Sequence, residues 1–375
     1  MLSLNKSSER KKTVLVVGDG FAGLAAARYL SGRALELVFC GSGSALFLPL
    51  LPDLVSGRLR EEALFHDYRG EFARKGNVRL VSSRVRALDP EKKTARFADG
   101  SLLAWDCCIL ACGAEPAFSL PGTLLFSGLE GARRAAALPP GEVTVVGGGY
   151  TGVELAGAFA RRGLAVRLVE AAPAILGGLP GRVRRRVERA LRQSGGRVLA
   201  GTVVENRDGG LFLGAERLDP ARVVVAAGVR GASGFLPDGL ADKKTGRLPV
   251  NPALQVAPGL YAAGDLAGFA WRGRFLRPSV NFALTQGRRA ARNVWRECRG
   301  KSPRPYRRSD PGFLVPVYSR GRAWGSAFGC PLGGRIGLFA HYAVCVLRAF
   351  SLGQALRVLR QLCGGGKVLR QDRER

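Results

Sequence analysis

The sequence predicts an α/β fold with two similar halves, followed by a helical C-terminal region. An apolar β-branched run, a glycine-rich turn and a helix-forming stretch occur in that order twice, within residues 13–30 and 143–163. The 375 residues are enough for two domains and an appendage. The hydrophobic content of 46% and the charged content of 23% are typical of globular proteins, so a disordered or collagen-like chain is excluded.

The first unit begins with residues 13–17 (TVLVV), which predict a short buried strand. Gly18, Gly20 and Gly23 follow, and the residues after them (LAAARYL) favour a helix. In such a unit the first glycine makes a tight turn, the second lets the backbone approach a pyrophosphate, and the third lets helix and strand pack closely. The N–H groups at the start of the helix then bind the anion.

The second unit has the same order of residues. The strand predicted at 143–146 (VTVV) leads into Gly147, Gly149 and Gly152, and then into the helix-forming VELAGAFARRG. A single glycine pattern of this kind is a weak signal, because a glycine-rich turn often has only a structural role. Two copies, each between a strand and a helix, predict two Rossmann-like domains that bind dinucleotides.

The residue at the end of the next strand distinguishes the two units. After the second unit, residues 166–170 predict a strand that ends in Glu170. A carboxylate there accepts hydrogen bonds from ribose hydroxyls and repels a 2′-phosphate, which favours NADH over NADPH, although the neighbouring Arg167 leaves NADPH open. After the first unit Cys40 stands at this place, so the usual carboxylate is missing, and Asp19 lies close to the expected phosphates.

A third segment, residues 260–265 (LYAAGD), predicts a short strand that ends in a Gly-Asp turn. By itself this pattern favours an ordinary strand and turn. With the two glycine turns and this segment in this order, however, the chain resembles the flavoproteins that have two dinucleotide-binding domains. The resemblance implies that the first turn holds FAD, the second holds a nicotinamide nucleotide, and the late carboxylate contacts the flavin cofactor.

Within that superfamily, the FAD-dependent pyridine nucleotide-disulfide oxidoreductases, the sequence is most similar to the type II NADH:quinone oxidoreductases. The similarity is carried by residues 46–51 (LFLPLL) and 147–157 (GGGYTGVELAG). It implies hydride transfer from NADH to FAD, and then electron transfer from the reduced flavin to a membrane quinone. The cofactors carry that chemistry, so we expect neither a catalytic triad nor a metal site.

The resemblance also implies which residues hold each cofactor. Those carried over to FAD are Gly18, Gly20, Phe21, Ala22, Gly23, Pro49, Gly113 and Asp265. Those carried over to NADH are Gly147, Gly149, Gly152 and Glu170. Glu154 matches a family glutamate near the junction of nicotinamide and flavin, where it would relay protons. The alternative is a carboxylate that only stabilises the start of its helix.

Contacts with the quinone are carried over to Asn281, Thr285 and Gln286. In the family, two glutamines of the segment that matches residues 277–287 face the quinone, and this chain has Asn281 and Thr285 in their places. We therefore expect an altered contact with the quinone head group, and a different acceptor stays open.

The order of the motifs predicts a divided FAD-binding domain, made of residues 12–121 and 246–300. The NADH-binding domain, residues 122–245, lies between these two parts of the sequence. Residues 301–375 are expected to form a C-terminal membrane-association region.

The C-terminal region contains a strongly apolar segment, residues 336–347, and a second predicted helix, residues 355–362, with arginines on its polar side. An apolar face flanked by aromatic residues and cations is what a helix lying in the plane of an anionic membrane surface requires. The resemblance implies peripheral attachment at the cytoplasmic face of the cell membrane. A packing helix, or one that forms a homodimer, is the alternative.

The chain is strongly basic, with 58 Lys and Arg residues against 29 Asp and Glu residues, a formal net charge of +29. Such a charge favours anionic partners. The arginine-rich residues 182–192 predict a solvated helix face and no specific nucleic-acid site, because no aromatic residues are interleaved for base stacking. Most of the eight cysteines lie in apolar runs, as Cys108 and Cys112 do, and predict core residues in a reducing compartment.

Two other functions stay open because of the departures at Cys40, Asn281 and Thr285. One is a soluble flavin reductase that passes electrons to another acceptor. The other is a non-catalytic homologue of the same fold that binds a nucleotide or a polyanion.

Overall fold

The computed structural model describes residues 10–364, and these fall into two compact units. Unit 1 consists of residues 10–45, 67–114 and 230–309, and unit 2 consists of residues 46–66, 115–229 and 310–364. The chain passes between the units five times, at residues 309/310 and within four short strands, β3 (Ser44–Leu46), β4 (Phe65–Asp67), β10 (Ala114–Pro116) and β19 (Val229–Gly231). The domain boundaries expected from the sequence stay predictions, and the end of the C-terminal region, residues 365–375, lies outside the described residues.

Unit 1 is built on a six-stranded sheet in which only β21 runs antiparallel to its neighbour. The strands, in spatial order, are β21 (Gln255–Ala257), β22 (Leu260–Ala262), β9 (Cys107–Leu110), β1 (Thr13–Val17), β2 (Glu36–Cys40) and β5 (Val78–Val81). All five residues of β1 are buried, as expected for a parallel strand covered on both faces. The strand predicted at 13–17 is confirmed, and β22 confirms the short strand predicted within residues 260–265.

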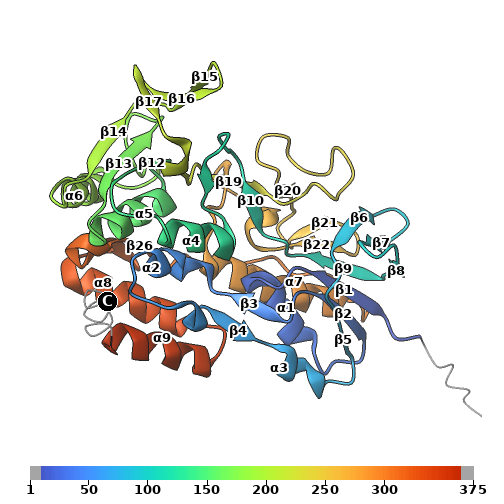
Figure 1. Cartoon of the computed structure of the whole chain (residues 1–375). Coiled ribbons are helices and arrows are strands. Elements are labelled where there is room, and N and C mark those ends of the chain that lie inside the picture. Colours follow the sequence, from blue (N-terminus) through green and yellow to red (C-terminus); the bar gives the residue numbers. More distant parts are fainter. Residues whose placement is uncertain (1–9, 365–375) are drawn as a thin grey trace, which may run out of the picture. The chain divides into compact units, whose positions relative to one another are not determined.

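Two helices of unit 1, α1 (Phe21–Leu30) and α7 (Val280–Glu297), pack closely against each other (Figure 1). Gly287 permits this approach, because a Cβ atom there would lie 2.1 Å from the carbonyl oxygen of Ala22. The other elements of the unit are α3 (Arg69–Ala73), β6 (Val85–Asp89), β7 (Thr94–Phe97), β8 (Leu102–Ala104), β20 (Leu248–Pro249), η4 (Gly264–Leu266), β23 (Ala267–Gly268), β24 (Ala270–Trp271) and β25 (Arg274–Phe275).

Unit 2 contains a second parallel sheet of five strands. In spatial order these are β11 (Leu124–Leu125), β18 (Val223–Val225), β12 (Glu142–Val146), β13 (Ala165–Glu170) and β14 (Arg197–Ala200). Its helices are α2 (Leu51–Val55), α4 (Gly128–Ala136), α5 (Tyr150–Arg161) and α6 (Gly181–Arg192). Short elements complete it: η1 (Leu48–Leu50), η2 (Glu61–Ala63), β15 (Glu205–Arg207), β16 (Gly210–Leu213), β17 (Glu216–Leu218) and η3 (Pro220–Arg222). The predicted α/β fold with two similar halves is therefore confirmed.

The sequence did not predict the small antiparallel sheet that precedes the C-terminal helices. It consists of β26 (Gly312–Val317), β27 (Arg322–Ala327) and β28 (Cys330–Gly333), with η5 (Tyr318–Arg320) between the first two strands. This sheet packs on α5, where a Cβ atom at Gly157 would lie 3.1 Å from the backbone nitrogen of Tyr318.

The two C-terminal helices are α8 (Gly334–Leu347) and α9 (Leu352–Gly364), which cover the segments expected to be helical (Figure 1). Each buries one face and exposes large apolar side chains on the other. Within residues 10–364, none of the helices combines the length and the apolar character needed to span a bilayer.

Candidate functional site

The first glycine turn joins β1 to α1 in unit 1. Gly18 has a φ of 101°, and a Cβ atom there would lie 2.5 Å from the carbonyl oxygen of Ala111. A Cβ atom at Gly23 would lie only 1.7 Å from the carbonyl oxygen of Gly18. Gly20 precedes α1 as its N-cap residue, and a Cβ atom there would have no other atom within 4 Å. Packing thus requires glycine at Gly18 and Gly23, while Gly20 keeps the start of the helix accessible to a ligand.

The second turn, between β12 and α5 in unit 2, repeats this geometry. Gly147 has a φ of 110°, and its Cβ atom would lie 2.5 Å from the carbonyl oxygen of Ala226. A Cβ atom at Gly152 would lie 1.7 Å from the carbonyl oxygen of Gly147, while one at Gly149 would have no other atom within 4 Å. The N–H groups at the start of each helix and the positive end of its dipole make both turns suitable for a pyrophosphate. The residues present therefore fit two dinucleotides, one in each unit.

Residues of the last segment of unit 1, residues 230–309, lie beside the first turn. Phe21 and Ala22 are buried, and a Cβ atom at Gly264 would lie 3.1 Å from the Cβ atom of Ala22. The Oε1 atom of Gln286 accepts a hydrogen bond of 2.8 Å from the backbone N–H of Gly264, next to Asp265. Burial raises the pKa of Asp265, while the charge of Arg247 opposes this shift. The structure thus brings the turn, the Gly-Asp segment and Gln286 together.

Asp19 of the first turn lies beside the residues that follow β2. Cys40, which ends β2, is buried, and this burial raises the pKa of its thiol to about 12. The Oδ2 atom of Asp19 accepts hydrogen bonds from the backbone N–H of Ser42 at 2.6 Å and from the hydroxyl of Tyr68 at 2.8 Å. Gly41 makes room for it, because a Cβ atom there would lie 2.5 Å from the Cβ atom of Asp19. The glycine motif predicted the turn, but it did not predict that the Asp19 side chain bonds to Ser42 and Tyr68.

In unit 2 the carboxylate at the end of β13 is held against the second turn. The Oε2 atom of Glu170 accepts a hydrogen bond of 2.6 Å from the backbone N–H of Gly148, and Oε1 accepts one of 2.7 Å from Ala172. Each carboxylate oxygen has a second lone pair, so Glu170 retains the capacity to accept hydrogen bonds from a ligand.

A buried acidic cluster in unit 2 was not predicted from the sequence. Asp53 of α2 is fully buried and accepts hydrogen bonds from the hydroxyls of Tyr318 at 3.0 Å and Tyr342 at 2.5 Å. Burial raises the pKa of Asp53 to about 6, although Tyr342 and the nearby Arg58 favour its ionised form. The only signal in the sequence is one acidic residue within the apolar run LFLPLLPDLV.

Glu154 of α5 belongs to the same electrostatic environment. Burial, and then the charge of Asp53, raise the pKa of Glu154 well above its ordinary value. Burial, and then the charge of Arg58, lower the pKa of His341 to about 4, so this imidazole is neutral at physiological pH. Two carboxyl groups of unit 2 can therefore hold protons at a higher pH than exposed carboxyl groups do.

The expected quinone-binding side chains are all bonded within unit 1. The amide Nδ2 of Asn281 donates to the carbonyl oxygen of Ser309 at 2.6 Å. The hydroxyl of Thr285 donates to the carbonyl oxygen of Asn281 at 2.7 Å and lies 2.8 Å from the hydroxyl oxygen of Tyr306. Gln286 is 2% exposed, and its amide oxygen is the acceptor for Gly264.

The two remaining residues expected at FAD lie in different units. Gly113 of unit 1 has a φ of 74°, and its carbonyl oxygen accepts a hydrogen bond of 3.2 Å from Ala232. Pro49 is half-buried in η1 of unit 2. All eight cysteines have free thiols, and Cys108 lies in the core of unit 1, as expected.

Comparisons with known proteins agree with this geometry. A family model described as pyridine nucleotide-disulphide oxidoreductase matches residues 12–290. The chain is 28% identical over 272 residues to a nitric oxide reductase FlRd-NAD(+) reductase of Klebsiella pneumoniae subsp. pneumoniae, covering 68% of this chain and 72% of that protein. It is also 28% identical over 314 residues to the type II NADH:quinone oxidoreductase NdhA of Mycobacterium tuberculosis, covering 68% of this chain and 66% of that protein.

Among solved structures, NDH2 from Plasmodium falciparum in complex with NADH has the same fold, with a TM-score of 0.82 and 15% identity. The match covers 96% of this chain and 99% of that one. Since the family model covers most of the chain and both glycine turns, the chain belongs to the pyridine nucleotide-disulphide oxidoreductase family.

Proposed function

We propose that the protein is a type II NADH:quinone oxidoreductase, a peripheral enzyme that oxidises NADH and reduces a quinone at the cytoplasmic face of the membrane. Its cofactors are FAD and NADH. Bound FAD would supply the chemistry of hydride acceptance and electron transfer. The residues of the chain bind and orient the two cofactors and supply or accept protons.

We assign FAD to the turn of unit 1 and NADH to the turn of unit 2. Gly20 leaves space for the FAD pyrophosphate, and Asp19 supplies a carboxylate in place of the one missing at Cys40. Gly149 and Glu170 have the matching roles for NADH. The FAD-binding segments at residues 12–121 and 246–300 and the NADH-binding segment at 122–245 remain part of this proposal.

Reduction of a quinone also consumes a proton, and Glu154 is our candidate to supply it. Its raised pKa keeps it protonated at a pH where an exposed glutamate is ionised. The buried Asp53, with the hydroxyls of Tyr318 and Tyr342, forms a second hydrogen-bonded group in the same unit, which takes up a proton as the pH falls through about 6.

The observation that carries the quinone assignment is the exposed apolar face of α8 and α9. Large side chains repeat there at helical spacing, and their exposed fractions reach 76% for Phe339 and 81% for Leu347. The set is Ile336, Phe339, Val344, Leu347, Leu352, Leu356 and Leu359. Arg335 and Arg360 are exposed on the same helices. Such a surface is suited to the interface of an anionic bilayer, where a quinone is dissolved.

This surface gives a direct test. Replacing Phe339 and Leu347 by serine should weaken binding to vesicles of anionic lipid by about a hundredfold, since each side chain contributes about 1.5 kcal/mol on burial. Turnover with a vesicle-bound quinone should fall, while turnover with a water-soluble acceptor should not change. Vesicle sedimentation and NADH oxidation measure the two effects.

The matched control is Leu102→Ser, which removes a side chain that is 62% exposed on β8 of unit 1. It should leave vesicle binding unchanged. Equal quinone turnover in the Phe339→Ser/Leu347→Ser variant and the parent would reject the membrane assignment and favour a soluble acceptor. A protein that retains no flavin at all would favour the non-catalytic alternative.

Glu170 tests the assignment of NADH to unit 2. Replacing Glu170 with alanine should raise the KM for NADH by about tenfold, because a ribose hydroxyl loses its charged acceptor. Flavin content should stay at the parental value. Steady-state kinetics with NADH and NADPH should also show a smaller preference for NADH, since the charge that repels the 2′-phosphate is gone. Loss of flavin and of NADH affinity to the same degree would contradict the assignment.

A further inference from the structure

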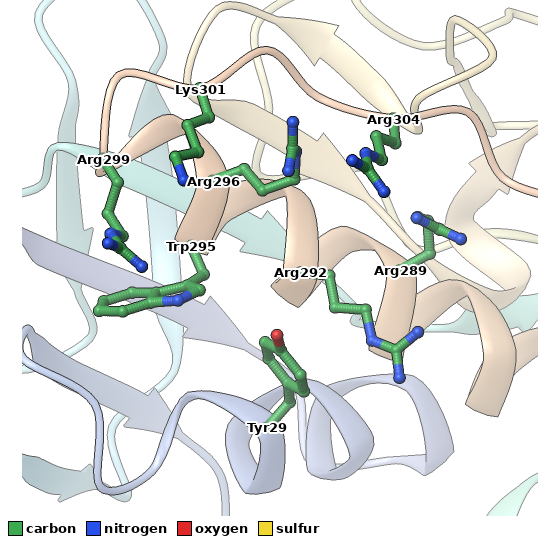
Figure 2. Close-up of a pocket in the computed structure, with 8 residues that line it drawn as sticks. All are labelled: Tyr29, Arg289, Arg292, Trp295, Arg296, Arg299, Lys301 and Arg304. Atoms are coloured by element: carbon green, nitrogen blue, oxygen red, sulfur yellow. The ribbon is translucent and has the colours of Figure 1, made fainter.

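A pocket in unit 1 is lined almost entirely by cations. It has a volume of about 360 Å³ and lies between α1, the C-terminal half of α7 and the segment that follows α7. Figure 2 shows Tyr29 and Trp295 on one side of the pocket and the basic side chains, from α7 and the segment after it, around the rest. The lining residues are Tyr29, Arg289, Arg292, Trp295, Arg296, Arg299, Lys301 and Arg304. None of them is a residue that we assign to FAD, NADH or quinone.

The positive charge of the pocket is not neutralised by the protein. In the part of the chain that the structure describes, none of the six lining cations forms a salt bridge with a carboxylate. Burial, and then the charges of Arg292, Arg304, Arg307 and Arg296, lower the pKa of Arg289. Guanidinium groups gathered at this density repel one another, so an anion of several charges would stabilise the arrangement.

The backbone around the pocket is held in place by hydrogen bonds between α7 and the segment that follows it. Asn293 of α7 is fully buried, accepts a hydrogen bond of 2.9 Å from the backbone N–H of Arg304 and donates one of 2.8 Å to its carbonyl oxygen. The N–H of Lys301 bonds to the carbonyl oxygen of Arg296 at 2.9 Å. These hydrogen bonds fix the segment that follows α7 against that helix, so cations from both line one pocket, although four of the six, Arg292, Arg299, Lys301 and Arg304, are exposed.

The aromatic rings orient the cations and are not free for base stacking. The guanidinium of Arg33 lies 4.1 Å from the ring centre of Tyr29 and 5.1 Å from that of Trp295. Arg292 lies 5.6 Å from the Tyr29 ring, and Arg299 lies 5.5 Å from the Trp295 ring. Cations placed over ring faces take the positions that nucleic-acid bases would need.

We propose that this pocket binds the polyphosphate group of a small molecule, with at least two linked phosphates. Several arginines around one cavity offer the paired N–H donors that phosphate oxygens accept. The volume is in the range of small-molecule sites, and a single phosphate would leave most of the cations unpaired. The phosphates belong either to free polyphosphate or to a nucleoside polyphosphate.

Calorimetric titration of the flavin-loaded full chain tests this proposal. Tripolyphosphate should bind with one site per chain, at least about tenfold more tightly than orthophosphate, and its affinity should fall steeply as salt is added. An equal affinity for tripolyphosphate and ATP indicates free polyphosphate as the ligand class. Tighter binding of ATP indicates a nucleotide.

Two variants with the same change in net charge separate a defined site from the general basic field. Replacing Arg292 and Arg299, both exposed lining residues, by glutamine should weaken tripolyphosphate binding by about a hundredfold. Replacing the exposed Arg185 and Arg186 of α6 by glutamine should change it less than about twofold, since these residues contribute only to the long-range field.

Equal losses in the two variants would overturn the proposal and leave a diffuse positive field as the explanation. Binding of a single-stranded RNA more tightly than tripolyphosphate, with the same dependence on Arg292, would overturn it in favour of a nucleic-acid surface. A third variant, Trp295→Phe, keeps the cations and should retain binding while losing any ligand-induced change in tryptophan fluorescence that arises at the pocket.

Discussion

Replacing Gly149 with alanine is expected to raise the KM for NADH by about tenfold or more without loss of flavin or of stability. No atom lies within 4 Å of the position of the new Cβ atom, and the backbone φ of −73° suits alanine. The protein therefore loses no internal contact. The methyl group instead fills the space at the start of α5 through which the pyrophosphate approaches, and each tenfold loss corresponds to about 1.4 kcal/mol of binding.

The matched variant for this experiment is Gly152→Ala, in the same turn. Its Cβ atom would lie 1.7 Å from the carbonyl oxygen of Gly147, a separation that forces the backbone to move. We expect a lower melting temperature as well as weak NADH binding, since overpacking of this kind costs about 1–3 kcal/mol. Gly149→Ala, in contrast, should leave the melting temperature unchanged or slightly raised, because alanine reduces the freedom of the unfolded chain.

The same change in unit 1 should affect the other cofactor. Gly20 also has open surroundings and a φ of −70°, so Gly20→Ala should reduce the flavin content of the purified protein and leave its fold intact. Visible absorbance of bound flavin and the KM for NADH distinguish the two variants. If Gly149→Ala lowers flavin content, or if Gly20→Ala affects only the KM for NADH, the assignment of one cofactor to each unit is wrong.

The turns were predictable from the sequence because the geometry that requires glycine there is local. In each turn the atoms that a side chain would strike include the oxygen of a glycine only five residues away, as for Gly23 and Gly18. The strands before the turns are equally local, since a β-branched run such as residues 13–17 can be recognised without its partners. These local patterns were enough to predict two sheets of parallel strands, each with one glycine turn.

The buried acidic cluster and the basic pocket were not predictable, because each depends on contacts between distant parts of the chain. Asp53 is contacted by Tyr318 of η5 and Tyr342 of α8, which follow it by 265 and 289 residues. Tyr29 and Arg292 meet at the pocket only because α1 packs on α7. Periodicity assigns such residues to a face of an element, but it does not say which other element covers that face.

The Asp53 cluster should make the stability of the protein depend on pH in an unusual direction. A carboxyl group whose pKa is raised on folding stabilises the folded state while it is protonated, and this contribution is lost as the pH rises through the folded-state value. For Asp53 the pKa rises from an ordinary value of 3.8 to about 6. The contribution is therefore complete below pH 3.8 and lost over the interval from pH 3.8 to somewhat above pH 6, with a size of about 3 kcal/mol.

Replacing Asp53 with asparagine should remove this dependence, because the amide keeps the shape of the side chain but does not titrate. Urea unfolding of parent and variant between pH 4 and pH 7 should show the variant gaining about 3 kcal/mol relative to the parent over that range. Glu61→Gln is a control in which stability should depend on pH in the opposite direction. The hydrogen bond from Arg133 lowers the pKa of Glu61, so this interaction stabilises the fold fully above pH 4.5 and is lost as the pH falls through the lowered pKa.

Tyr342→Phe sharpens the same test, since the hydroxyl of Tyr342 donates to the Asp53 carboxylate and holds its pKa below the value that burial alone would give. Without that donor the loss of stability should move to a higher pH. A parent protein whose stability relative to Asp53→Asn is constant from pH 4 to pH 7 would show that the carboxyl does not titrate there. Of the two buried carboxyl groups, Glu154 alone would then be a candidate to hold a proton in this range.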